Sequence, residues 1–215
     1  MKKMGKIKNG ILGAFSGKVG TVVGAVWNGV AYIRSLPQSV KNPRTPAQLM
    51  QRSKFLAAFT FLKAVNSLLR VGWKAYATGR SPINAAMSYT IDRAMTGSYP
   101  NYSVAPDMAL VSRGLLTPAF ETDLGAAGNS VLVKWEDNSG TGSAQATDRA
   151  LVAVANQSKG EAVTVNGGAA RSAGRQEVNV PAVWQNDDLH CYLGFISEDG
   201  KEVSNSVYAG SIAIA

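Results

Sequence analysis

The sequence predicts an α+β protein in which a β-hairpin and a helical hairpin are followed by an all-β sandwich. Three observations lead there: an Asn-Gly pair between two apolar runs, two helical segments that open on proline, and regularly spaced alternating runs after residue 107. We expect a basic arm at residues 1–18, a basic hairpin and two-helix module at 19–106, and the sandwich at 107–215. With 215 residues, 46% of them hydrophobic, the chain can bury a sizeable core.

The hairpin is predicted from two β-branched or aromatic runs, Val19–Trp27 and Val30–Leu36. Asn28-Gly29 separates them, and this pair favours the two-residue turn in which both central residues have positive φ. Both faces of the predicted ribbon are apolar. Since an isolated two-stranded ribbon is marginally stable in water, we expect it to be covered by the helices or by another chain.

The first helix is predicted to begin at Thr45-Pro46, which pairs an N-cap hydroxyl with proline at the first helical position, and to run to about residue 76. Ser81-Pro82 repeats the signal and predicts a second helix from Pro82 to Met95. At 100° per residue, Lys63, Arg70 and Lys74 all fall within about 40° of Arg52, so a continuous first helix would carry them as one basic stripe. Such a stripe is either a binding line for phosphates and acidic surfaces or an ordinary solvated face.

The sandwich is predicted from seven short runs punctuated by Gly, Asn and Asp, a pattern typical of immunoglobulin-like or fibronectin type III-like domains. The runs are Ala109–Leu115, Val131–Trp135, Ala150–Val154, Ala162–Val165, Glu177–Val180, His190–Ile196 and Val207–Ile214. The single cysteine, Cys191, excludes an internal disulfide, which favours the fibronectin-like version.

Charge is divided sharply along the chain. Residues 1–91 contain fourteen Lys and Arg and no Asp or Glu, whereas residues 92–215 contain eight basic and fourteen acidic residues. Such a dipole favours binding to a polyanion or head-to-tail assembly with further copies.

No catalytic or cofactor motif is found. The segment GAFSGK at 13–18 departs from the phosphate-loop pattern in glycine spacing and in the residue after Lys18. His190 and Cys191 are strand neighbours, so their side chains are expected to point to opposite faces and not to form a nucleophile and base. The sequence therefore predicts a protein that is not an enzyme, with no cofactor and no metal.

The N-terminus lacks the pattern of a signal peptide, and the uncharged run at 19–33 is shorter than the roughly 20 residues of a spanning helix. We expect no membrane span and a location in the cytoplasm or in a virion.

Several segments together resemble a family of uncharacterised proteins from Bacteroidota and associated genomes that carries a domain of unknown function. The resemblance lies in GAFSGKVGTVVGAVWNGVAYIRSLP, NPRTPAQLMQRSKF, SPINAAMSY with TGSYP, LVSRGLL, KWEDNSGTGSAQATDRALVAV, GAARSAG and SEDGKEVSNSVYAG. It covers Gly5 to Gly210 and implies no catalytic residues.

The first functional expectation is a self-assembling structural protein, such as a virion or phage-derived component, whose basic region faces nucleic acid or an acidic neighbouring subunit. The alternatives are a monomeric, sequence-nonspecific nucleic-acid-binding protein and a carbohydrate or cell-surface binding module. Eight basic residues are the candidate contacts to a polyanion or partner: Lys18, Arg34, Lys41, Arg44, Arg52, Lys63, Arg70 and Lys74.

Overall fold

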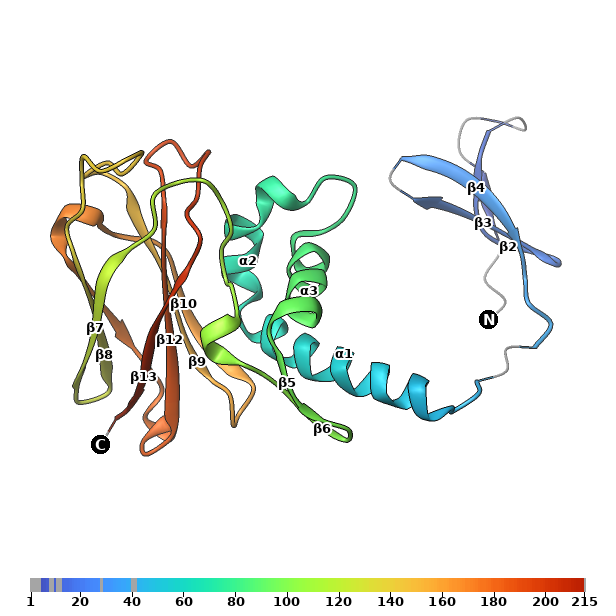
Figure 1. Ribbon diagram of the computed structural model, residues 1–215. Helices are drawn as coiled ribbons and strands as arrows, with labels where there is room; N and C mark the ends of the chain where they lie inside the picture. The colour runs from blue at the N-terminus through green and yellow to red at the C-terminus, as the bar shows by residue number, and fades with distance from the viewer. Residues whose placement is uncertain (1–4, 8–9, 11–12, 28, 40–41, 215) are drawn as a thin grey trace. The chain divides into compact units, whose positions relative to one another are not determined.

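The computed structural model describes residues 5–7, 10, 13–27, 29–39 and 42–214. The chain forms two compact units, an N-terminal unit (Met1–Thr45) and a C-terminal unit (Pro46–Ala215). The predicted boundaries after residues 18 and 106 both fall inside these units. The helices therefore belong with the sandwich and not with the hairpin, because they pack against one of its sheets (Figure 1).

The N-terminal unit is one antiparallel sheet in the strand order β1-β2-β3-β4. Its strands are β1 (Lys6–Ile7), β2 (Phe15–Val19), β3 (Val22–Trp27) and β4 (Val30–Ser35). The predicted hairpin is present as β3 and β4, and Gly29 has the positive φ of 83° that its turn requires, while Asn28 lies outside the described residues.

The basic arm predicted at residues 1–18 is wrong where the structure describes it, because β1 and β2 lie there. The predicted strand from Val19 is instead divided by a turn at Gly20, which has φ of 58°, so that Val19 pairs with Val22. The sequence pattern did not indicate β2, because Gly17 and Lys18 interrupt the apolar alternation that begins at Phe15 and ends at Val19.

The C-terminal unit begins with the helices α1 (Pro46–Ala64), α2 (Asn66–Gly72), η1 (Lys74–Tyr76) and α3 (Pro82–Arg93). Both predicted helix starts are confirmed, and the Ser81 hydroxyl accepts a hydrogen bond from the backbone N–H of Asn84 at 3.3 Å. The predicted end of the second helix is too late, because the short hairpin β5 (Met95–Ser98) and β6 (Asn101–Val104) begins there.

The prediction of one helix from residue 45 to 76 is wrong. The chain breaks at Val65, and α1 and α2 meet at 84°. Val65, Leu68 and Leu69 are fully buried in the same cluster. Asn66 and Ser67 are weak residues for a helix interior, so packing of these three side chains decides the direction of the chain.

The sandwich consists of a four-stranded sheet in the order β10-β9-β12-β13 and a three-stranded sheet in the order β11-β8-β7. The strands are β7 (Phe120–Ala127), β8 (Ser130–Glu136), β9 (Arg149–Asn156), β10 (Glu161–Ala170), β11 (Arg175–Asn179), β12 (Asp188–Ile196) and β13 (Val207–Ala213). Single turns of 3₁₀ helix lie at η2 (Pro106–Met108), η3 (Arg171–Ala173) and η4 (Ala182–Trp184). The predicted sandwich is thus present.

The four-stranded sheet is the middle of three layers, with helices on one face and the three-stranded sheet on the other (Figure 1). Along β9, Leu151, Ala153 and Ala155 belong to the cluster formed with the helices. Val152 and Val154 alternate with them and join the cluster between the two sheets. Burial on both faces explains why β9 reads as a continuous apolar run.

The predicted strand Ala109–Leu115 is wrong, and β7 was missed. Residues 109–115 pair with no strand. Their backbone groups are bonded by side chains and loops: Val111 N–H donates to the Ser206 hydroxyl (2.9 Å), and Arg113 N–H donates to the Gly72 carbonyl (2.9 Å). The sequence of β7, FETDLGAA, gives a weak strand signal, because two acidic residues and a glycine interrupt its apolar residues.

Candidate functional site

The N-terminal sheet has a basic face. Lys18 on β2 pairs with Val23 on β3, and Val23 pairs in turn with Arg34 on β4. Residues directly opposite each other on neighbouring strands share a face, so Lys18 and Arg34 lie on the same side of the sheet. Lys6 joins them, because it pairs with Ser16, two residues before Lys18.

Two exposed aromatic side chains lie on this basic face. Trp27 follows Val23 by four residues on β3, and Tyr32 precedes Arg34 by two residues on β4, so the alternation of strand residues puts both on the same side. Trp27 is 67% exposed and Tyr32 is 44% exposed. We call this surface the basic–aromatic face, formed by Lys6, Lys18, Trp27, Tyr32 and Arg34.

The opposite face of the sheet is apolar. We call it the apolar face, and its described residues include Ile7, Phe15, Val19, Val26 and Ile33. Four of these are at least half exposed, Ile33 at 65% and Val26 at 59%. Gly24 also lies on this face, but it is buried. The Phe15 ring lies across it so closely that an added Cβ would stand 2.6 Å from that ring.

The predicted contact residues are divided between the two units of the chain. Lys18, Arg34 and Arg44 are exposed in the N-terminal unit, and Lys41 lies outside the described residues. Arg52 and Lys63 are exposed on α1, whereas Arg70 lies on α2 and Lys74 on η1, beyond the 84° bend. The predicted single stripe of four is therefore wrong, because it required a straight helix through residue 65.

Sequence reasoning missed Lys6, Trp27 and Tyr32 as members of a site. The sequence predicts a covered ribbon for both aromatic residues and an arm without secondary structure for Lys6. The available signal was the two-residue period, which places Tyr32 with Arg34 once both are known to lie on one strand.

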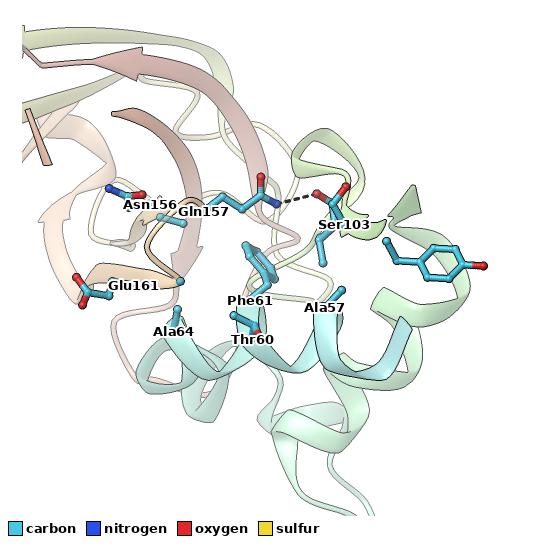
Figure 2. A pocket seen from close by; sticks show the side chains of 12 residues that line it. Ala57, Thr60, Phe61, Ala64, Ser103, Asn156, Gln157 and Glu161 are labelled. Atoms are coloured by element: carbon cyan, nitrogen blue, oxygen red, sulfur yellow. Dashed lines mark hydrogen bonds between the residues drawn. The ribbon is translucent and has the colours of Figure 1, made fainter. Parts of the chain in front are cut away.

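A small hollow of about 220 Å³ lies between α1, β6 and the turn that joins β9 to β10 (Figure 2). Phe61, Ala57 and Ala64 of α1 supply much of its apolar wall. Two of its polar groups have partners within the protein: the Gln157 amide donates to the Val104 carbonyl at 2.8 Å, and the Glu161 carboxylate accepts from the Trp184 indole N–H at 3.2 Å. Among the described residues, no His, Cys or Lys side chain lines the hollow.

His190 and Cys191 point to different sides of β12, as the sequence predicted. Cys191 is fully buried between the sheets, and this burial raises the pKa of its thiol to about 12. His190 has its Nδ1 atom 2.9 Å from the Tyr208 hydroxyl, and partial burial lowers the pKa of its imidazole. A protonated, enclosed thiol is not a nucleophile at neutral pH.

The most buried charged pair, Arg171 and Asp148, has a structural role. The Arg171 guanidinium donates to Asp148 (3.1 Å), to the Asn138 side-chain oxygen (2.7 Å) and to the Thr117 carbonyl (2.9 Å). Its Cζ also lies 3.8 Å from the centre of the Phe195 ring. The pair therefore ties several loops of the sandwich together and leaves no donor pattern open for a ligand.

Within the described ranges, no group of three or more His, Cys, Asp and Glu side chains is placed to hold a metal ion. No single helix in the part of the chain that the structure describes is long and apolar enough to cross a membrane. The bent pair α1–α2 reaches that length and composition only when its two helices are taken together.

Comparison with known proteins gives a family without an assigned function. No curated protein and no solved structure matches the chain. The model of a family of unknown function, DUF6266, matches residues 14–210, a range that runs from the N-terminal sheet to strand β13. The chain therefore belongs to the DUF6266 family.

Proposed function

We propose that this is a non-enzymatic structural protein that assembles with further copies of itself through the N-terminal sheet, as a component of a virion or phage-derived particle. The observation that carries the proposal is the division of that sheet into the apolar face and the basic–aromatic face. The first would be covered by a second copy, and the second would face nucleic acid or an acidic neighbouring subunit.

The apolar face supports assembly on energetic grounds. A single sheet layer has no second layer on which to bury its side chains, and such small units rarely reach independent stability. Full burial of a Val or Ile side chain contributes about 1.5–3 kcal/mol. The exposed Ile7, Val19, Val26 and Ile33 are therefore a large free-energy source for association.

Charge supports a second copy as the partner. The N-terminal unit contains eight basic residues and no acidic residue, whereas the C-terminal unit contains fourteen of each. The acidic residues all lie after residue 91. The basic N-terminal unit of one copy is thus complementary in charge to the acidic residues on the sandwich of the next copy. Contacts with those acidic residues would offset the repulsion between N-terminal units, which all have positive charge.

The test is size-exclusion chromatography with light scattering on the nuclease-treated protein at low and high salt. We expect a particle larger than the monomer that persists at high salt. The double variant Val26→Ser/Ile33→Ser should shift it toward the monomer. The control Val183→Ser removes an exposed valine from η4, outside the N-terminal sheet, and should change nothing, since Val183 is 72% exposed. A wild-type monomer under all conditions would contradict the proposal.

The alternative is a monomeric, sequence-nonspecific nucleic-acid-binding protein. The basic–aromatic face favours it, because exposed aromatic rings beside basic side chains are what single-stranded nucleic acid binds, by stacking and by phosphate contacts. It predicts that Trp27→Ser weakens binding of a short oligothymidylate by about 1–3 kcal/mol. Three phosphate contacts would give a slope of log K against log salt of about −2.

Fluorescence anisotropy with the labelled oligonucleotide measures both quantities. Arg34→Gln should make the salt slope shallower, whereas Arg175→Gln on β11, an equal charge change outside the face, should not. A monomer that binds in this way would favour the alternative over assembly. Equal effects of Trp27→Ser and Arg175→Gln would exclude the face as the contact.

A further inference from the structure

Three arginines converge on a second hollow, which lies in the C-terminal unit and which sequence reasoning did not identify as a site. Its volume is about 470 Å³. Arg80 lies just before α3, Arg93 is the last residue of α3, and Arg113 comes from the extended segment at 109–115. Ser88, Tyr89 and Asp92 of α3 complete the polar lining.

Arg113 is held in place before any ligand arrives. Its backbone N–H donates to the Gly72 carbonyl at 2.9 Å. The chain is also closely packed at Gly72 and at Gly114, the residue after Arg113, because a Cβ added at Gly72 would stand 2.6 Å from Ser112 and one added at Gly114 would stand 1.9 Å from the Val203 carbonyl oxygen. Neither glycine can be replaced without moving the segment that carries Arg113.

The side chain of Arg113 is positioned by aromatic rings. Its Cζ lies 4.5 Å from the centre of the Tyr76 ring, 5.5 Å from that of Tyr89 and 5.8 Å from that of Trp73. Cation–π contacts of this kind orient a guanidinium through its faces and leave its N–H edges available. Arg113 is also partly buried.

No described residue accepts a hydrogen bond from the Arg113 guanidinium or forms an ion pair with it. The one carboxylate in the hollow, Asp92, is bonded to Arg93 at 2.9 Å. Arg80 donates from Nε to the Tyr76 carbonyl at 3.5 Å, a long contact. Three guanidinium groups thus share one carboxylate, so two of the three positive charges in the hollow have no acidic partner in its lining.

We propose that this hollow binds a phosphate group. Planar guanidinium forks match the oxygens of phosphate in bidentate geometry, which is why arginine and not lysine predominates where phosphate is recognised by shape. A net charge of two positive units, from three arginines and one aspartate, matches a phosphate dianion better than a single carboxylate. The volume of the hollow is larger than one phosphate group, so the phosphate can be part of a larger molecule. The site is formed within the C-terminal unit and does not depend on assembly through the N-terminal sheet.

The test is isothermal titration calorimetry of the full-length protein at low ionic strength, with inorganic phosphate, pyrophosphate and acetate as separate probes. We expect saturable binding of phosphate and tighter binding of pyrophosphate, with acetate much weaker. Arg113→Gln should weaken phosphate binding by about tenfold or more, as expected for loss of hydrogen bonds to a charged group. The matched control Arg175→Gln, at an exposed residue of β11, should bind as the wild type does.

Arg113→Gln also removes the cation–π contacts, so it could act by loosening the fold. Arg80→Gln and Arg93→Gln avoid this ambiguity, because both side chains are exposed and bury no ring, and each should weaken binding while leaving the thermal unfolding temperature unchanged. Absence of saturable phosphate binding, acetate binding as tight as phosphate, or an equal loss in Arg175→Gln would each overturn the proposal.

A short oligothymidylate, titrated into the Trp27→Ser protein, separates two sources of the phosphate. If Arg113→Gln in that background weakens oligonucleotide binding, the group comes from a nucleic-acid backbone. If it weakens only phosphate and pyrophosphate binding, the ligand is a small phosphorylated compound. Either result supports the site.

Discussion

Both units contain strands rich in apolar residues, but only the C-terminal unit buries them between layers of its own. In the C-terminal unit, β9 and β12 are buried by helices on one side and by the three-stranded sheet on the other. In the N-terminal unit, all six residues of β4 are exposed, including Ile33 and Tyr32. The C-terminal unit thus contains three layers, whereas the N-terminal unit is a single sheet.

This contrast between a layered unit and a single sheet favours a second copy as the partner that covers the apolar face. An apolar sheet face is stable only where something removes it from water, and an exposed apolar patch of this kind usually marks an interaction site. The N-terminal unit also has a long exposed edge at β4, a feature that natural sheets usually protect. Strand β4 contains one charged residue, Arg34, and the side chain of Arg34 lies on the basic–aromatic face.

The largest expected effect comes from separating the units. We expect residues 46–215 alone to unfold in one cooperative transition, because both core clusters lie within them. Residues 1–45 alone should lack fixed tertiary structure at low concentration, since their sheet has no second layer. Amide NMR spectra of the two fragments measure this. A well-dispersed spectrum from a monomeric 1–45 fragment would remove the reason for a covering partner.

The next effect concerns the buried ion pair. Arg171→Met should lower the free energy of unfolding by about 3–5 kcal/mol, because Asp148 would remain buried without its partner. Chemical denaturation followed by tryptophan fluorescence gives the value. The double variant Arg171→Met/Asp148→Asn should recover part of the loss. If Arg171→Met were neutral, the network would not hold the sandwich loops together.

A matched pair of alanine substitutions sharpens the comparison further. Leu193→Ala, in the fully buried core between the sheets, should cost about 2–5 kcal/mol of unfolding free energy. Ile33→Ala, on the apolar face, should cost less than about 1 kcal/mol in the monomer, because Ile33 is already 65% exposed there. Its effect should appear instead as a larger dissociation constant for assembly in sedimentation equilibrium. Equal destabilisation of the monomer by both changes would show that Ile33 is covered within its own chain.

Local signals predicted the elements that depend on local chemistry. Proline after a hydroxyl residue marked the starts of α1 and α3, and Asn-Gly marked the turn whose Gly29 has positive φ. Alternation located most strands of the sandwich, and the arrangement of His190 and Cys191 followed from the two-residue period of β12. Each of these depends on residues only a few positions apart.

The errors share one cause, since they depend on contacts between distant residues. The break at Val65 follows from burial of Leu68 and Leu69 and not from a helix-breaking residue. The segment at 109–115 reads as a strand but is bonded by Ser206 and Gly72, far away along the chain. The candidate sites show the same limit: Trp27 joins Arg34 only once the register of β3 and β4 is known, and Arg80, Arg93 and Arg113 meet only in the folded unit.

The sequence by itself determined the fold class, the concentration of basic charge before residue 92 and the lack of a catalytic motif, because composition and short-range periodicity carry that information. The tertiary structure alone decided that the helices cover the sandwich, that the N-terminal sheet has two unlike faces, and that three arginines share one hollow. The physical reason is that strand register and layer packing are set by free energies summed over residues far apart in the chain, which no short stretch of sequence contains.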